Sequence, residues 1–358
     1  MNTVVICNTF YQFIVAYQLK RTIFKEDNVY LIVSDQTKAL WECIKRISSI
    51  NYFSGVVPIK TKFVKNRKKK IIGLIKDIHD MISPKQIFDS LGDISIDRII
   101  YYNYDDLALA LYTYAVKKNS KIEVARYEEG ILSYNFQFPY KRIKVLCSIQ
   151  KLFLGSSLRT STSSFYCTYP DAYNGDMAVN RIPKIDFSPE DIERLRYIFS
   201  INIEKNQYKE KYIFLTSMYD FEGGSPIHEK EIVDDIKKIV GKDNLLVKLH
   251  PRDVRGVYSN QEYNIDSNSR CPWEIILLTT DLSNKVILTA TSGSAMSTNL
   301  MIDNGPKVYF LYKLCDISTN QTAQYTVNTI DKIMSNVQIK KMLNNVIVVK
   351  DSVNEVLN

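Results

Sequence analysis

Three short groups of polar residues follow predicted strands, where their side chains could carry out acid–base chemistry or bind an anion. The first is Tyr127-Glu128-Glu129-Gly130, which ends the strand-like run 122–127. Two adjacent carboxylates before a glycine project acid groups from a sharp turn at the edge of a sheet. Such a carboxylate can accept the proton of a hydroxyl group when its surroundings raise its pKa. The ordinary alternative is a solvated acidic turn.

The second group is His250-Pro251-Arg252, which follows the apolar run 245–249. A histidine can donate a proton to a leaving group near neutral pH. The proline fixes the turn, and the arginine offers a planar fork suited to a phosphate or a carboxylate. The alternative is a histidine that only satisfies hydrogen bonds at a strand end. The other two histidines, His79 and His228, lie in helical segments and are weaker candidates.

The third group joins the apolar strand 286–290 to a predicted helix and includes Thr291, Ser292, Gly293 and Ser294. Unpaired N–H groups and the helix dipole favour an anion at such a helix start. The alternative is ordinary capping of the helix by Ser292 or Ser294. The pattern G-x-x-x-x-G-K is absent, so the loop is not a P-loop. A turn at 223–225 could bind a second anionic group.

The sequence gives no sign of a metal site or a cofactor. It contains no D-x-D triplet of the kind that holds a metal in many sugar transferases, so we expect either a metal-free route or a leaving group that needs less neutralisation of its charge. The six cysteines are scattered without a C-x-x-C pair, and there are only three histidines. This usage disfavours a structural zinc site and fits a reducing, cytoplasmic environment.

The alternation of strands and helices predicts an α/β fold with two Rossmann-like domains facing a central cleft. We expect an N-terminal domain at 1–165, a C-terminal domain at 205–340 and a tail at 341–358 that packs back. The connection falls within about residues 155–205, where breakers cluster. A helix is expected to begin with Ser225 as N-cap and Pro226 as its first residue.

The net charge of +8 is distributed unevenly. A basic run at Lys65–Lys70, followed by an amphipathic stretch, and a second basic and apolar stretch at 141–155 could lie on an anionic membrane. The alternative for both is a solvated helix face. No run of 18 apolar residues, signal peptide or nucleic-acid-binding motif occurs, so we expect a cytoplasmic protein at the inner membrane face without a nucleic-acid partner. The oligomeric state stays open, a homodimer included.

Taken in order, the three groups resemble the motifs of bacterial sialyltransferases, above all glycosyltransferase family 52, which contains the lipooligosaccharide and capsule sialyltransferases. The related bacterial polysialyltransferases share the first two motifs. The opening V-I-C-N-T-F-Y-Q-F is similar to the family's first strand and its Thr-x-x-Gln turn. The third motif departs from the pattern because Gly293 separates the hydroxyl residues, so two pairings are open.

The resemblance implies a GT-B fold and an inverting, metal-independent transfer from CMP-sialic acid to a galactose-type hydroxyl of a lipooligosaccharide or capsule precursor. It assigns roles to the motif residues: Glu128 as general base with Glu129 beside it, His250 as general acid, Gly130 and Pro251 as loop formers, and Arg252, Thr291, Ser292 and Ser294 on the donor side. Asp220 is an alternative base. A different nucleotide-sugar donor, or a non-catalytic module that binds membranes or polyanions, are the rival interpretations.

Overall fold

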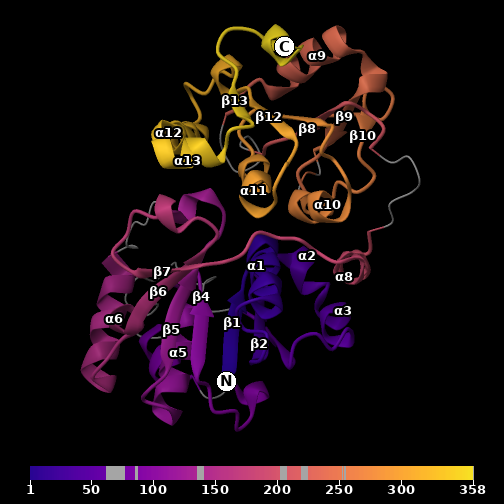
Figure 1. The fold of residues 1–358 in the computed structure, drawn as a ribbon. Coiled ribbons are helices and arrows are strands. Elements are labelled where there is room, and N and C mark those ends of the chain that lie inside the picture. The colour runs from indigo at the N-terminus through magenta and orange to yellow at the C-terminus, as the bar shows by residue number, and fades with distance from the viewer. Residues whose placement is uncertain are drawn as a thin grey trace. The chain divides into compact units, whose positions relative to one another are not determined.

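The computed structural model describes residues 1–61, 77–84, 88–134, 141–201, 208–218, 225–251, 253 and 255–357. The chain forms two compact units (Figure 1). Unit 1 comprises Met1–Glu129 and Ser133–Pro183, and unit 2 comprises Gly130–Leu132 and Lys184–Asn358. Four earlier predictions lie outside the described residues: the membrane contact at Lys65–Lys70, and the roles of Arg252, Asp220 and the 223–224 glycines.

Unit 1 is built on a seven-stranded, wholly parallel sheet in the order β3-β2-β1-β4-β5-β6-β7. Its strands are β1 (Asn2–Cys7), β2 (Asn28–Ser34), β3 (Gly55–Ile59), β4 (Arg98–Tyr101), β5 (Glu123–Tyr127), β6 (Thr162–Cys167) and β7 (Ala178–Arg181). The central strands are apolar along most of their length because a parallel sheet is covered on both faces.

The helices of unit 1 lie between its strands in the chain. They are α1 (Phe10–Arg21), α2 (Lys38–Trp41), α3 (Ile44–Ser49), α5 (Asp106–Lys118), α6 (Lys141–Leu154) and α7 (Leu158–Ser161), and residues 77–82 are also helical. One core joins α5 and α6 to the sheet, with Leu107 and Leu111 of α5 packed in the same cluster as Ile99 and Tyr101 of β4. This packing fixes the strand ends that carry polar residues.

Unit 2 repeats the arrangement with a six-stranded parallel sheet in the order β10-β9-β8-β11-β12-β13. Its strands are β8 (Tyr212–Leu215), β9 (Leu245–Lys248), β10 (Asn264–Ile265), β11 (Val286–Thr289), β12 (Lys307–Phe310) and β13 (Val346–Val348). Its helices are α8 (Pro189–Phe199), α9 (Glu229–Val240), α10 (Trp273–Thr279), α11 (Gly293–Met301), α12 (Gln321–Ser335) and α13 (Val337–Met342).

The structure corrects the expected start of α9. The helix begins at Glu229, with His228 in the left-handed region at its N-cap, instead of at Pro226 after a Ser225 cap. The buried carboxylate of Glu229 explains the later start, because both its oxygens accept a hydrogen bond from the backbone N–H of Ser217. No helix in the described part of the chain is both long and apolar enough to cross a membrane.

Candidate functional site

The acidic motif lies at the carboxyl edge of the unit 1 sheet, where three neighbouring strands end. Strands β1, β4 and β5 are adjacent, and their polar continuations are Thr9, Asp105 and the Glu128-Glu129 pair. Because parallel strands all end at the same edge, these carboxylates and the hydroxyl are brought together although they are far apart in the chain. Gly130 follows with a φ of 68°, a left-handed conformation that a glycine adopts without strain.

The carboxylate of Glu128 is buried and fully engaged in hydrogen bonds. One oxygen accepts from the hydroxyl of Thr168 at 2.6 Å and from that of Tyr11 at 3.5 Å. The other accepts from the backbone N–H of Thr168 at 3.0 Å and from the hydroxyl of Tyr134. Burial raises the pKa of Glu128, and the hydrogen bonds from Thr168 and Tyr134 oppose this increase. Through Tyr11, Tyr134 and Thr168, this side chain connects the end of β5 to three other segments of unit 1.

Glu129 is placed differently from its neighbour. The residue as a whole is partly exposed, although protein encloses most of its carboxyl group. One carboxylate oxygen accepts a hydrogen bond from the hydroxyl of Thr9 at 2.6 Å. Its backbone N–H donates to the hydroxyl of Ser133 at 3.1 Å. Burial raises the pKa of Glu129, and the negative charge of Asp105 adds to this effect. A partly accessible carboxylate with a raised pKa has the properties of a general base.

Asp105 is a further titratable group at this edge, and its sequence pattern alone did not single it out. It is the N-cap of α5: its carboxylate accepts from the backbone N–H of Ala108 at 2.9 Å and from the side-chain amide of Asn8 at 3.1 Å. Burial raises its pKa to about 6, and the nearby charge of Asp106 contributes. The only sequence signal for its role was its place after the buried strand β4.

In unit 2, the histidine motif and the Ser/Thr loop are connected through the end of the strand between them. Strand β8 lies between β9 and β11. The hydroxyl of Thr216, after β8, accepts a hydrogen bond from the backbone N–H of His250 at 2.9 Å. The next residue, Ser217, shares a 3.0 Å hydrogen bond between its hydroxyl and that of Thr291. The carboxyl edge of this sheet therefore holds both motifs in one hydrogen-bonded group.

Thr216 and Ser217 were missed as site residues. The signal available was a Thr-Ser pair directly after the apolar run Tyr212–Leu215. Hydroxyl residues at that position satisfy backbone groups of neighbouring loops, as Ser and Thr side chains commonly do.

The strand end before His250 is fixed by a buried lysine. Lys248, the last residue of β9, donates from its ammonium group to the carbonyl oxygens of Cys271 at 2.8 Å and Asn268 at 3.0 Å. It also lies 3.5 Å from a carboxylate oxygen of Asp266. Burial lowers the pKa of Lys248, and the charge of Asp266 opposes this decrease. These contacts hold the loop 266–271 against the turn that carries His250.

The hydroxyl residues at the start of α11 differ in how they are engaged. Thr291 is buried and bonded to Ser217, whereas the hydroxyl of Ser294 forms a hydrogen bond with the buried carboxyl of Glu274. Ser292 is the N-cap residue of α11, is partly exposed and makes no capping hydrogen bond with its side chain. Of the two capping candidates, Ser292 therefore holds the position, without the expected side-chain bond.

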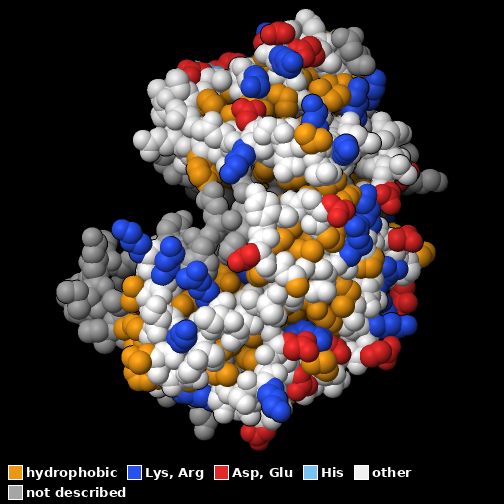
Figure 2. All heavy atoms as spheres, turned by 60° about the vertical axis from the view of Figure 1, so that its left-hand side comes forward, with side chains coloured by type: hydrophobic (Ala, Val, Ile, Leu, Met, Phe, Trp, Pro, Cys, Tyr) orange, Lys and Arg blue, Asp and Glu red, His pale blue; other side chains and the backbone are white. Residues whose placement is uncertain are grey.

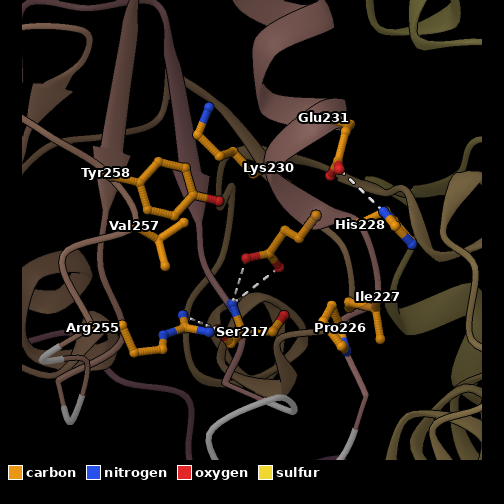
Figure 3. Close-up of a pocket in the computed structure, with 10 residues that line it drawn as sticks. Ser217, Pro226, Ile227, His228, Lys230, Glu231, Arg255, Val257 and Tyr258 are labelled. Atoms are coloured by element: carbon orange, nitrogen blue, oxygen red, sulfur yellow. Dashed lines mark hydrogen bonds and ion pairs between the residues drawn. The ribbon is translucent and has the colours of Figure 1, made fainter.

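A pocket of about 330 Å³ opens beside these loops within unit 2 (Figure 3). Its lining includes Ser217 and the basic side chains His228, Lys230 and Arg255. The guanidinium of Arg255 donates to the carbonyl oxygen of Ser217 at 3.2 Å, and the close-up shows it reaching toward that residue. The volume lies at the lower end of the range for small-molecule sites. The lining also includes Glu229 and Glu231. Its basic side chains are paired with carboxylates: His228 with Glu231, Lys230 with Asp234 and Arg255 with Asp253.

The predicted residues thus fall into two groups, one in each unit. Glu128 and Glu129 lie at the carboxyl edge of the unit 1 sheet, and His250, Pro251, Thr291, Ser292 and Ser294 lie at that of unit 2. Gly130 follows Glu129 directly in the chain and belongs to the short segment 130–132 of unit 2. Within the described ranges, no three His, Cys, Asp or Glu side chains are grouped so that they could hold a metal ion.

Known proteins resemble this chain in sequence family and in fold. The family model "Alpha-2,8-polysialyltransferase (POLYST)" matches residues 3–312. No curated protein matches the chain. CalG4, the calicheamicin glycosyltransferase, is a similar structure with a TM-score of 0.52 and 8% identity over 96% of this chain and 93% of that one. The glycotransferase of kitacinnamycin has a TM-score of 0.55 and 10% identity over 99% and 88%. Both have the GT-B fold, which confirms the predicted fold class.

Proposed function

Since the chain belongs to the alpha-2,8-polysialyltransferase family, we propose that it transfers sialic acid from CMP-sialic acid to a hydroxyl group of a glycan, with inversion at the anomeric carbon and without a metal ion. The family match over residues 3–312 is the observation that carries this proposal. It supports a sialyltransferase enzyme, as the resemblance indicated. Assignment to glycosyltransferase family 52 stays a prediction.

We assign the general base to Glu129. The carboxylate accepts the proton of the acceptor hydroxyl, and the hydroxyl oxygen forms a bond to the anomeric carbon as the bond from that carbon to the CMP phosphate breaks. Glu129 suits this step because it is partly accessible and its pKa is raised. Glu128 remains a candidate, but its four hydrogen-bond donors favour a supporting role.

We assign the general acid to His250, which donates a proton to a phosphate oxygen of the departing CMP. Thr216 fixes the backbone of this residue, and Lys248 fixes the strand before it. Ser292 and the N–H groups at the start of α11 supply donors for the phosphate or for the sialic acid carboxylate.

Two acceptor classes follow from different observations. The family's description points to an α-2,8 linkage, which requires a sialic acid at the end of the acceptor glycan. The sequence motifs favoured a galactose-type terminus of a lipooligosaccharide or capsule precursor. The two are distinguished by offering the protein a lactose-type acceptor and a sialylated one.

The proposal is tested with a panel of CMP-, UDP- and GDP-linked sugar donors and mass spectrometry of both acceptors. We expect a product only with CMP-sialic acid. A product formed from a UDP- or GDP-linked sugar instead would show that the fold serves another donor, since fold alone does not determine the substrate.

A further inference from the structure

Helix α6 of unit 1 presents an apolar surface to solvent. It buries Ile143, Leu146, Cys147 and Gln150 against the rest of unit 1. On other sides of the helix, Leu152 is 82% exposed, Phe153 61% and Val145 46%. No other large hydrophobic side chain in the described part of the chain is as exposed as Leu152. Burying a side chain of this size is favourable, and adjacent exposed apolar side chains mark a surface that contacts another molecule or a membrane.

The apolar residues are interleaved with basic ones. Lys144 and Lys151 are exposed and lie seven residues apart, each directly before one of the exposed residues Val145 and Leu152. The seven-residue spacing aligns Val145 with Leu152 and Lys144 with Lys151, in two neighbouring rows along the helix. The basic row therefore flanks the apolar one. Between Lys141 and Leu154 the sequence contains no acidic residue. In Figure 2, which brings the side of α6 forward, hydrophobic and basic side chains adjoin one another on unit 1.

The helix is held firmly, so the exposed residues do not belong to a frayed end. Near its start, Arg142 forms ion pairs of 2.6 Å with Asp77 and with Asp106. Near its end, the side-chain amide of Gln150 donates to the carbonyl oxygen of Leu109 and to the hydroxyl of Thr113, both at 2.9 Å. The position of Leu152 and Phe153 on the surface is therefore built into the fold.

We propose that this face of α6 docks on an anionic lipid membrane. Leu152 and Phe153 enter the boundary between headgroups and acyl chains, and Lys144 and Lys151 lie among the negative headgroups. The charge pattern argues against a second copy of this chain as the occupant, because a symmetric contact would place the same lysines against one another. The inference does not depend on the donor or acceptor proposed above.

Vesicle co-sedimentation of the full chain tests this proposal. The test variant is Leu152→Ser with Phe153→Ser. The matched control is Tyr325→Ser with Val337→Ser on α12 and α13, where the side chains are 70% and 67% exposed and lie in unit 2. Phosphatidylcholine vesicles are used with and without phosphatidylglycerol, at low and high salt. Thermal unfolding verifies that both variants fold.

We expect the parent chain and the control to bind the phosphatidylglycerol vesicles at low salt. The Leu152/Phe153 variant should bind at least about tenfold more weakly, because the two inserted side chains are lost. A Lys144→Glu with Lys151→Glu variant should lose binding to a similar extent. Unchanged binding by the Leu152/Phe153 variant would overturn the proposal. The proposal would also be overturned if the parent chain did not bind the vesicles and instead formed a dimer that the Leu152/Phe153 variant dissociates. That result would identify a second copy of the chain as the partner of this surface.

Discussion

Glu128 and Glu129 are neighbours in the sequence but differ in their contacts, so their substitutions should have different effects. Changing Glu128 to alanine removes the acceptor for four hydrogen bonds, from the Tyr11 and Tyr134 hydroxyls and from the hydroxyl and backbone N–H of Thr168. The hydroxyl groups can rotate toward other partners. The buried N–H of Thr168 cannot, and an unsatisfied donor of this kind costs about 1–3 kcal/mol.

The lost side-chain volume adds to this cost, whereas relief from burying a carboxylate of raised pKa offsets part of it. We therefore expect Glu128→Ala to lower the free energy of unfolding by about 2–3 kcal/mol. For a unit of this size, that corresponds to a decrease in Tm of roughly 5–10 °C. Glu129→Ala loses the hydrogen bond from Thr9 and the favourable interactions with Gln12 and Arg126, and it is relieved of repulsion by Asp105. Its free energy of unfolding should change by less than about 1 kcal/mol.

For the rate of transfer we expect the reverse order, with the larger loss in the Glu129 variant. Glu129→Ala should reduce the rate of transfer from CMP-sialic acid at least about a hundredfold, as expected for loss of a general base. Thermal unfolding and initial-rate measurements on both variants check the pair of predictions, with the exposed Glu42→Ala as a neutral control. If Glu128→Ala melts like the parent protein and is inactive, while Glu129→Ala transfers normally, the reasoning is refuted and Glu128 is the base.

Four further predictions follow from other parts of the two units. The pKa of Asp105 is raised to about 6, so the folded state binds a proton more readily than the unfolded state, and stability should fall as pH rises from about 4 to about 6. Asp105→Asn keeps the helix cap and should make the free energy of unfolding, measured by denaturant titration, depend less on pH. An equal dependence on pH in the variant would contradict the raised pKa of Asp105. His250→Gln should lower kcat at least about a hundredfold with little change in Tm, and near-normal turnover would remove it from the mechanism. Lys248→Met should lower the free energy of unfolding in urea by about 3–5 kcal/mol, because Asp266 stays buried without its charged partner. The double variant Lys248→Met, Asp266→Asn should recover part of this free energy. An unchanged free energy of unfolding in the single variant would count against a structural ion pair. Transfer should proceed unchanged in excess EDTA, and a loss restored by adding a divalent ion would rule out the metal-free route.

Local sequence pattern was enough to predict the strands that are apolar throughout. The expected strands 245–249 and 286–290 correspond to β9 and β11, each within a residue of the observed bounds. Strands β6 and β7 were not predicted. Residues 162–167 read TSSFYC, with three hydroxyl residues at the start, and all four residues of β7 are exposed. Strand β7 is at the edge of the sheet, and β6 beside it begins with polar residues, so both carry little of the hydrophobic signal on which such predictions depend.

The candidate site was predicted at the level of motifs and not of individual atoms. Each motif was placed at a strand end, and the structure has Glu128, His250 and Ser292 there. What distinguishes Glu128 from Glu129 is contact with Thr168, forty residues further along the chain. Short-range spacing cannot reveal a contact of that separation. The same limit concealed Thr216, whose role depends on its position between two neighbouring strands.

The most direct test of the account is the transfer reaction itself, followed by mass spectrometry of a sialylated acceptor incubated with CMP-sialic acid and the parent chain, Glu129→Ala or His250→Gln. The account predicts a mass increase of one or more sialic acid residues with the parent chain, and at least about a hundredfold slower formation of product with either folded variant. Product formed at the parental rate by both variants, or no product with any CMP-linked donor while a UDP- or GDP-linked sugar is transferred, would contradict it.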